Sequence, residues 1–532
     1  MDVCAYRYPS RRNVVFGMNG MVCTSQPLAA QAGLEVLREG GNAMDATVAT
    51  AACMTVLEPT SNGLGSDAFA IIYSAKDHKL HGLNASGPAP MALDVEKVRA
   101  LGSIPKRGWI PVTVPGAPGA WAAISSRFGR LPFERLFSSA IDYAKSGYPL
   151  QPVTSQLWKE SFDEFQRTLA DSCFRSWFET FATESGAPLA GSVVRLPDHA
   201  RSLSMIAESN GESFYRGELA KRIDAFSRES GGYLRYEDLA TYHPQWVEPI
   251  AADYRGCQVW EIPPNGHGIV ALMALRMLSG FTFGKRDTVD TLHRQIEALK
   301  LAFSDAKRYV ADPRYMKARV EELLGDDYMS HRRSLIGLRA LDPEPGNPSS
   351  GDTVYLCVAD REGNMVSYIQ SNYMGFGSGL VVPHTGIALQ NRGCNFTLDP
   401  AMENCMAPGK RPYHTIIPGF LTKDGNPIGP FGVMGGFMQP QGHLQVVTNL
   451  VDFVMNPQEA LDAPRWQWTG GRRVEVEKAF RPEVIEGLRG RGHDIVVVPH
   501  GREMGRGQII MRYGESLMGA TEPRADGMVA AY

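Results

Sequence analysis

The chain has 532 residues, of which 43% are hydrophobic and 21% are charged, and its formal net charge at pH 7 is −3. This composition is that of an ordinary folded protein and excludes general disorder. A net charge so close to zero also argues against binding to nucleic acid or to an anionic membrane through bulk charge. The 55 glycines and 35 prolines indicate many tight turns.

The N-terminal residues carry charges and a proline and have no apolar core of signal-peptide length. The best apolar run, from Gly268 to Leu278, is interrupted by Arg276 and is too short to span a bilayer. The eight cysteines are scattered and include no C-x-x-C pair. We therefore expect a soluble cytoplasmic protein without a membrane segment or a disulfide framework.

In the first half of the chain, apolar runs begin and end at prolines and glycines. They predict, in chain order, a helix from 27 to 39, a helix from 42 to 58, a buried strand within 61–74, and a strand, turn and helix over 109–121. Residues 120–250 are expected to be mostly helical. A glycine turn then opens a buried helix ending near residue 278, and the helical pattern continues over 292–310.

The composition changes at Leu341, where LDPEPGNPSSGD contains three prolines and almost no apolar residue. We expect a flexible linker over about 341–352. The β-forming run from Thr353 to Ala359, the turn REGN and the run from Met365 to Ile369 then predict a hairpin. Because both faces of this hairpin are apolar, it should lie inside a sheet that is covered on both sides.

From the hairpin to the C-terminus, strand-like and helical patterns alternate. They predict a strand at FGVMGG, a helix from about Gln441 to Val454, strands at VEVEK, DIVVVP and GQIIMRY, and a helix near Val484 to Leu488. The sequence shows no internal repeat.

The junction before Thr353 suggests chemistry, because a polar linker ends abruptly at a hydroxyl residue that opens a buried strand. A threonine made N-terminal by chain cleavage has its own α-amine within reach of its hydroxyl, so the amine serves as general base and no histidine is needed. This amine titrates at a pKa of about 8, which suits proton transfer near neutrality. Thr353 is therefore a candidate nucleophile, and the alternative is that it only begins a strand.

Other catalytic and cofactor motifs are missing from the sequence. It has no G-x-S-x-G elbow, no H-E-x-x-H and no P-loop, and GFGSG at 375–379 lacks the spacing of a dinucleotide fingerprint. The twelve histidines show no metal-ligand spacing. We expect neither a cofactor nor a metal.

Four segments resemble the gamma-glutamyltransferase family. The run from Gly20 to Tyr73 is similar to its N-terminal signature, and the run from Gly351 to Asn391 is similar to its processing site and first small-subunit strands. FGVMGG and the closing ATEPRADG are also similar. The resemblance extends from about residue 15 to the C-terminus.

This family belongs to the N-terminal nucleophile hydrolases. The resemblance implies a four-layer αββα sandwich, in which two stacked antiparallel sheets are flanked by helices, and a precursor that cleaves itself before the threonine. In this chain it implies a large (α) subunit of residues 1–352 and a small (β) subunit of residues 353–532, together forming one sandwich domain.

The resemblance also implies roles for the catalytic residues. Thr353 stands at the nucleophile position, and Ser371 stands where the family has a second threonine that hydrogen-bonds the nucleophile. Gly435 and Gly436 match the glycine pair whose backbone N–H groups form the oxyanion hole. Two glycines after a strand let the backbone approach a developing oxyanion, where preorganised donors are effective. The alternative is a plain strand-to-helix turn.

The substrate pocket departs from the family. The glutamate-binding arginine falls at Ser86, the aspartate that holds the α-amine falls at Asn395, an asparagine becomes Tyr373, and the serine pair for the α-carboxylate becomes His414 and Thr415. Burying either charge of a glutamate zwitterion without a partner is costly. These changes argue against glutathione as substrate and against true transpeptidation.

The altered set resembles a branch of amidohydrolases in the family, which includes oxamate amidohydrolase and glutaryl-cephalosporin-type acylases. Both cleave amides whose acyl part carries a carboxylate and no α-amine. The candidate hydrogen-bond donors to the substrate carboxylate are Arg392, His414 and Thr415. Neutral candidates for the pocket are Tyr373, Asn395 and Ser86. The alternative for Arg392 is a structural ion pair.

The resemblance thus implies a self-processing N-terminal threonine amidohydrolase, with oxamate hydrolysis to oxalate and ammonia in purine breakdown as the first choice of reaction. The alternatives are a glutaryl-cephalosporin-type acylase, a gamma-glutamyl hydrolase or transpeptidase acting on glutathione-like substrates, and a binding role without catalysis. The expected partners are a small amide substrate and the two subunits from one precursor, with a dimer of αβ units as an open option and no nucleic acid or membrane.

Overall fold

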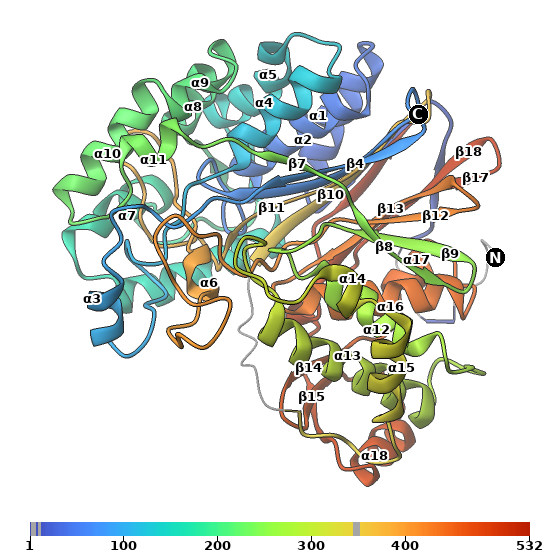
Figure 1. Ribbon diagram of the computed structural model, residues 1–532. Coiled ribbons are helices and arrows are strands. Elements are labelled where there is room, and N and C mark those ends of the chain that lie inside the picture. The colour runs from blue at the N-terminus through green and yellow to red at the C-terminus, as the bar shows by residue number, and fades with distance from the viewer. Residues whose placement is uncertain (2–6, 9–11, 344–351) are drawn as a thin grey trace.

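The computed structural model describes residues 1, 7–8, 12–343 and 352–532. Two seven-stranded sheets stack face to face at its centre, and helices cover the outer face of each sheet (Figure 1). Within both sheets every neighbouring pair of strands is antiparallel. The expected αββα sandwich is confirmed.

One sheet, called the β10 sheet, has the strand order β19-β2-β10-β11-β3-β4-β7. Its strands are β2 (Gly20–Thr24), β3 (Asp67–Ser74), β4 (Lys79–Ala85), β7 (Gln245–Val247), β10 (Asp352–Asp360), β11 (Met365–Tyr373) and β19 (Met528–Ala531). The predicted hairpin is β10 and β11, and it lies at the centre of this sheet between β2 and β3. Residues 353–360 and 365–373 are all buried, which confirms that both faces of the hairpin are covered.

The other sheet, called the β13 sheet, has the order β1-β18-β17-β13-β12-β9-β8. Its strands are β1 (Val15–Gly17), β8 (Ile250–Tyr254), β9 (Cys257–Glu261), β12 (Gly419–Lys423), β13 (Asn426–Met434), β17 (Arg506–Tyr513) and β18 (Ser516–Thr521). The sheets approach closely at Gly432, where an added Cβ would lie 2.4 Å from the Tyr355 ring. Two small sheets complete the strands: β14 (Trp466–Gly470) with β15 (Arg473–Glu477) and β16 (Asp494–Val498), and β5 (Tyr148–Pro149) with β6 (Val193–Val194).

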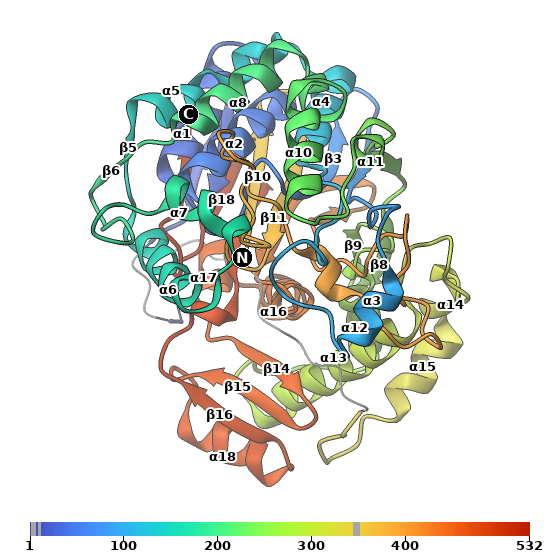
Figure 2. The ribbon, with the colours of Figure 1, turned by 90° about the vertical axis from the view of Figure 1, so that its left-hand side faces the viewer.

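Helices of the first half of the chain cover the outer face of the β10 sheet and share one apolar cluster with it (Figure 2). They are α1 (Pro27–Arg38), α2 (Ala43–Leu57), α4 (Ala117–Phe128), α5 (Ser138–Ser146), α6 (Pro152–Thr168), α7 (Arg175–Phe181), α8 (Pro197–Glu208), α9 (Glu212–Tyr215), α10 (Glu218–Glu229) and α11 (Tyr236–Ala240). In α2 all 15 residues are buried, which the small side chains allow, and Asn42 and Asp45 form a capping box at its start. The short α3 (Val95–Ala100) lies in a separate apolar cluster.

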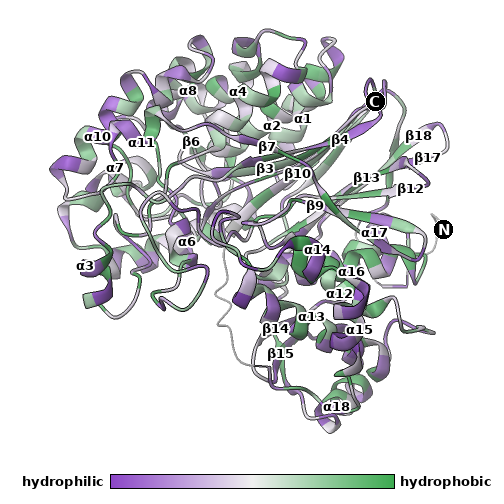
Figure 3. Cartoon of the chain, in the orientation of Figure 1, coloured by the Kyte–Doolittle hydropathy of each residue, from purple (hydrophilic) through white to green (hydrophobic). Residues whose placement is uncertain are grey.

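The remaining helices lie on the other side of the molecule (Figure 1). They are α12 (Gly268–Leu278), α13 (Val289–Tyr309), α14 (Val320–Leu323), α15 (Asp326–Ser334), α16 (Met438–Val451), α17 (Pro457–Asp462) and α18 (Pro482–Gly490). Of these, α12, α16 and α17 pack on the outer face of the β13 sheet, and the others pack farther out. Figure 3 shows mixed hydrophilic and hydrophobic segments on peripheral helices such as α8 and α10, as expected for helices with one buried face.

Strand alternation decides which side chains meet between the two sheets. Tyr355 and Cys357 of β10, Ile369 of β11, and Phe69 and Ile71 of β3 belong to the apolar cluster between the sheets. Counting by twos toward the ends of these strands places Thr353, Ser371 and Asp67 on the same inner face. Ser371 and Asp67 are direct partners in the β11–β3 pairing.

Several sequence predictions need correction. No strand forms over 109–115, because Pro111 and Pro115 interrupt the β-forming run and Val112 N–H turns back to the Trp109 carbonyl. The helix predicted at Gln441–Val454 is Met438–Val451. Most of the expected linker, 344–351, lies outside the described residues.

Leu341, the expected first residue of the linker, is instead anchored. Its N–H donates to Glu297 Oε2 at 2.9 Å, and its carbonyl accepts from Lys300 Nζ at 3.0 Å. Both partners lie on α13, and the Lys300–Glu297 ion pair is fully buried. The linker prediction was therefore wrong at this residue.

Candidate active site

Thr353 lies at the start of β10, almost completely buried, and its hydroxyl contacts two side chains. Its Oγ1 donates to Ser371 Oγ at 3.1 Å and accepts from Gln439 Nε2 at 3.4 Å. Ser371 Oγ also accepts from the Tyr373 N–H at 2.7 Å, and Gln439 Oε1 accepts from the Ile417 N–H at 2.9 Å. Both neighbours are therefore fixed by the backbone, and they orient the hydroxyl.

Gly435 and Gly436 join β13 to α16 beside this hydroxyl. Both have positive φ angles, 135° and 56°, which favour glycine. The Gly436 carbonyl accepts from the N–H of Gln439, the residue that contacts Thr353. The turn therefore places the amino end of α16, the positive end of its dipole, next to the candidate nucleophile.

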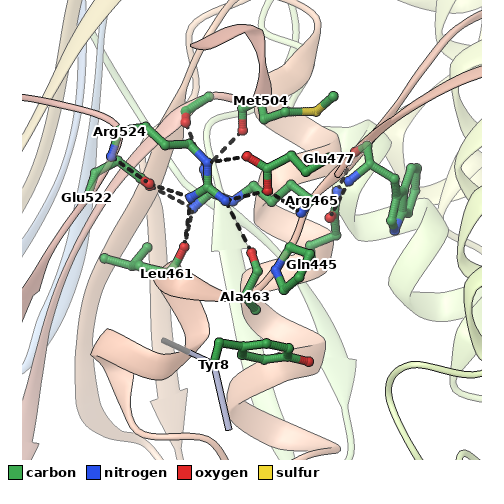
Figure 4. Close-up of polar contacts among 12 residues, drawn as sticks. Tyr8, Gln445, Leu461, Ala463, Arg465, Glu477, Met504, Glu522 and Arg524 are labelled. Atoms are coloured by element: carbon green, nitrogen blue, oxygen red, sulfur yellow. Dashed lines mark hydrogen bonds and ion pairs between the residues drawn. The ribbon is translucent and has the colours of Figure 1, made fainter. Parts of the chain in front are cut away.

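Figure 4 shows a network of charged side chains around Arg465 and Arg524, and this network contacts the loop that packs against the glycine turn. Arg465 donates to the Gly505 carbonyl at 2.8 Å, and an added Cβ on Gly435 would lie 3.2 Å from Gly505 Cα. Glu522 accepts from Arg465 at 2.7 Å and from Arg524 at 2.5 Å. Glu522 and Arg524 belong to the ATEPRADG segment, and this segment therefore stabilises the glycine turn through Arg465.

The opposing charges set the ionisation of this network. Burial alone would raise the pKa of Glu522, but the guanidinium groups of Arg465 and Arg524 hold it below its usual value. Arg524 also pairs with Glu477 at 2.6 Å, from β15. The network therefore joins the small three-stranded sheet to β18.

Arg392 is a fully buried cation near the nucleophile. Its guanidinium carbon lies 4.6 Å from the centroid of the Tyr373 ring, and its Nη1 donates to Thr415 Oγ1 at 2.6 Å. Its Nε lies 3.6 Å from Asp67 Oδ2, which is longer than a hydrogen bond. Nε and Nη2 have no hydrogen-bond partner among the described residues. Tyr373 has a positive φ of 76°, a strained conformation for a large residue.

Asp67 and His414 complete the charged cluster. His414 Nε2 lies 2.9 Å from Asp67 Oδ2, and His414 Nδ1 accepts from the Ile416 N–H at 3.4 Å, so Nε2 carries the proton and donates. Burial, followed by the charge of Arg392, lowers the pKa of His414 well below its usual value. Burial raises the pKa of Asp67 to about 7, although Arg392 opposes the rise. His414 is therefore neutral and supplies no cation.

The structure thus brings together Thr353, Ser371, the glycine pair, Tyr373, Arg392, His414 and Thr415. Asn395 lies in the same short 3-10 turn as Arg392, and its buried Nδ2 has no hydrogen-bond partner in the described part of the chain. The side chain of Ser86, in contrast, already has hydrogen-bond partners. Its hydroxyl lies 2.7 Å from Asn84 Oδ1 and 3.2 Å from Asn265 Nδ2, so two asparagines engage it.

Sequence reasoning missed Asp67 and Gln439. A carboxylate at the start of the wholly apolar strand AFAIIY was a usable signal for Asp67, because ionisable residues are seldom buried without a partner. Gln439 follows the glycine pair by three residues and had no comparable signal. The contact with Thr353 bridges 86 positions of sequence and becomes visible only in the fold.

Candidate metal ligands gather at one place in the described residues, where ligand atoms of His293, Glu297 and His493 lie within 4.8 Å of one another. Lys300 Nζ lies 2.8 Å from Glu297 Oε1 and occupies the place of a cation. His293 Nδ1 and His493 Nε2 are 2.8 Å apart, a hydrogen-bond distance. The group therefore acts as a buried polar network that holds the segment ending at Leu341.

Comparison with known proteins identifies a matching family model and several similar proteins. The family model for gamma-glutamyltranspeptidase matches residues 29–532. A glutathione hydrolase-like YwrD proenzyme of Bacillus subtilis is 34% identical, with 96% of this chain and 98% of the relative covered. An oxamate amidohydrolase proenzyme of Klebsiella pneumoniae is also 34% identical, with 97% and 98% covered.

A solved structure is more similar still. The crystal structure of a cephalosporin acylase from Bacillus halodurans is 59% identical to this chain, with a TM-score of 0.95 and coverage of 100% of this chain and 99% of that one. Among the described residues, no helix combines the length and the apolar character needed to cross a bilayer.

Proposed function

Since this chain belongs to the gamma-glutamyltranspeptidase family, we propose that Thr353 is the nucleophile of a self-processing amidohydrolase for amides whose acyl part carries a carboxylate. Family membership already makes the chain a C–N bond hydrolase produced as a proenzyme. Under the proposal, residues 1–352 become the large subunit and residues 353–532 the small subunit. The proposed oxyanion donors are the N–H groups of Gly435 and Gly436.

Processing begins in the precursor with attack of the Thr353 hydroxyl on the preceding carbonyl carbon. The peptide C–N bond breaks, an ester forms on Thr353, and its nitrogen becomes a free α-amine. Water then hydrolyses the ester and releases the new N-terminus. Ser371 and Gln439, which already contact Oγ1, hold the hydroxyl during these steps.

In the mature enzyme the Thr353 hydroxyl attacks the substrate amide carbon, and its α-amine takes the hydroxyl proton. The carbonyl oxygen becomes an oxyanion against Gly435 and Gly436. The proton passes to the leaving nitrogen, which departs as ammonia or an amine. Water, activated by the same α-amine, then hydrolyses the acyl-enzyme ester.

The observation that carries the choice of substrate is the buried guanidinium of Arg392. Two of its nitrogens lack hydrogen-bond partners within the described residues, and a charged group so placed is costly unless a ligand supplies an acceptor. A carboxylate on the acyl part of the substrate supplies that acceptor and can bind two nitrogens at once. No carboxylate stands at Asn395 to hold an α-ammonium group, which disfavours gamma-glutamyl substrates.

Oxamate is the smallest amide of this class, and the 34% identity to an oxamate amidohydrolase supports it as the first candidate substrate. It would place the enzyme in cytoplasmic purine breakdown. The 59% identity to a cephalosporin acylase favours a second candidate, a larger N-acyl amine with a dicarboxylic acyl group.

The test is release of ammonia or amine by the purified protein across oxamate, succinamate, glutaryl amides and gamma-glutamyl amides. We expect kcat/KM to be highest for an amide with an acyl carboxylate and no α-amine, and we expect Arg392→Met to lower it at least about tenfold, since a charge-assisted bidentate contact is lost. Thr353→Ala serves as the inactive control. Gamma-glutamyl amides cleaved as fast as the others would contradict the proposal.

A further inference from the structure

A second buried cation lies beside the glycine turn, on α13. The Nζ of Lys307 is 5.8 Å from the centroid of the Phe437 ring, and Phe437 directly follows Gly436. Phe303, one helical turn before Lys307, also faces Phe437, with ring centroids 6.2 Å apart. Lys307, in the large-subunit part of the chain, therefore lies beside the ring of the residue that follows the proposed oxyanion pair.

Three rings, called the aromatic wall (His267, Tyr413 and Phe437), connect Lys307 with the Arg392 cluster. Phe437 stacks on Tyr413 with centroids 6.0 Å apart and planes at 14°, and His267 meets both rings edge-on at 5.8 and 5.5 Å. Burial, and secondarily the charge of Arg392, lowers the pKa of His267 to about 3, so this ring is uncharged at pH 7. A neutral, mostly apolar set of buried rings thus lies between the two cations.

In the part of the chain that the structure describes, Lys307 has no anionic or hydrogen-bonding partner that accounts for its burial. Its Nζ is shielded from solvent and has no hydrogen-bond acceptor among the described residues. The neighbouring Arg308, in contrast, pairs with Glu403 at 2.8 Å. Burial lowers the pKa of Lys307 to about 8, so the ammonium still carries its charge at pH 7. A desolvated cation of this kind is costly to the fold and is typical of a site that awaits an anion.

We propose that Lys307 binds an anionic group on the amine part of the substrate, so that the preferred amides carry two anions. The acyl carboxylate lies at Arg392, the reacting carbonyl lies between Thr353 and the glycine pair, and the second anion lies beyond Phe437 at Lys307. A flat apolar middle section of the substrate then packs along the aromatic wall. This inference rests on the proposed function and narrows its substrate class to the second candidate, the larger N-acyl amines, because oxamate releases ammonia and has no amine part to carry a second anion.

The test uses two amides that differ in one carboxylate. Both carry the acyl group that performs best in the substrate panel, and the amine is aniline in one and 4-aminobenzoate in the other. We expect wild-type protein to show a lower KM for the 4-aminobenzoate amide. Lys307→Met should raise that KM about tenfold or more, while the KM of the anilide and both kcat values change by less than about twofold.

Two further variants separate binding from folding. Lys307→Arg should keep the preference for the second carboxylate, and Lys317→Met, at an exposed lysine, should change neither KM. Lys307→Met should still cleave itself and should melt no lower than wild type, because it removes an unpaired buried charge. A structural role would instead lower the melting temperature.

Equal changes in both KM values, or no change in either, would overturn the inference. So would a wild-type protein that hydrolyses both amides with the same KM. If the wild type releases amine from no carboxylate-bearing amide at all, the proposed function fails and the inference fails with it. If it hydrolyses them and the Lys307 variants make no difference, only the inference fails.

Discussion

At the scale of single residues, the ionisation of Asp67 controls how much positive charge Arg392 offers. Asp67 Oδ2 lies 3.6 Å from Arg392 Nε, and burial raises the pKa of Asp67 to about 7. Below that pH the carboxyl is neutral and the guanidinium is free to bind an acyl carboxylate. Above it, Asp67 becomes an anion that competes with the substrate for Arg392.

We therefore predict that the dicarboxylate product of the best substrate inhibits more weakly as the pH rises. Its inhibition constant should increase up to about tenfold between pH 6 and pH 8, as expected when binding requires one protonated group of pKa about 7. Asp67→Asn should make the inhibition constant nearly independent of pH over this range. The measurement is competitive inhibition at several pH values. A wild-type inhibition constant that does not change with pH, or a pH dependence that remains in Asp67→Asn, would contradict this role of Asp67.

The residues of the site were predictable only in part. Thr353, Ser371 and the glycine pair follow from local patterns together with family resemblance, because each lies at the end of a strongly apolar strand. Asp67 had a local signal that was overlooked, its place at the start of an apolar strand, whereas Gln439 and Lys307 were not predictable, because their roles depend on contacts between elements that are far apart in the chain. A pattern along one strand or helix carries no information on such contacts.

At the scale of elements, the position of the glycine turn depends on the buried network behind it. Glu522 accepts from Arg465, Arg524 and the Gly507 N–H, and Arg465 in turn holds the Gly505 carbonyl against the turn. Glu522 and Arg465 are buried and the Arg524 side chain is only 11% exposed, so removing one charge leaves the opposite charges without a partner. The ATEPRADG segment thus affects the candidate active site through packing.

We predict that Glu522→Gln lowers the free energy of unfolding by about 3–5 kcal/mol, the cost of breaking a buried ion pair from one side. It should also slow self-cleavage. Because the native pKa of Glu522 lies below its unfolded value, its stabilisation is present above about pH 4.5 and is lost as the pH falls through the native pKa. Thermal unfolding at pH 7 and pH 4 measures the loss of stability and its dependence on pH. Asp163→Asn, at an exposed pair with Lys159, is the control and should cost less than about 1 kcal/mol.

The elements themselves were predicted well where burial is complete. The hairpin β10–β11 and the helices α1, α2 and α12 have continuous apolar patterns and were recovered. The strands β4, β8 and β9 were missed, because they lie toward the sheet edges and mix polar with apolar residues. At 109–115 the β-forming side chains were present, but two prolines prevented pairing.

At the scale of the whole molecule, the proposed cut divides the chain but not the fold. The strand β10, whose first residue Asp352 precedes the cut, pairs with β2 of the large part and with β11 of the small part. The other sheet is mixed in the same way, because β12 of the small part pairs with β9 of the large part. Each sheet is completed only by strands from both sides of the cut.

We predict that the two pieces remain joined after cleavage. On gel filtration they should co-elute as a particle no smaller than 58.3 kDa, and they should separate only in denaturant. Unfolding of the cleaved form should be a single transition, since one core is shared. Separate elution of the two pieces under native conditions would show that the sheets are not shared as described.

The central claim, that Thr353 is the nucleophile, is tested most directly by intact mass and N-terminal sequencing of the purified wild type and Thr353→Ala. The wild type should give two polypeptides, the smaller one beginning at Thr353, and the variant should remain a single chain of 58.3 kDa. A variant that is still cut before position 353, or an uncut wild-type chain with full amidase activity, would contradict the account.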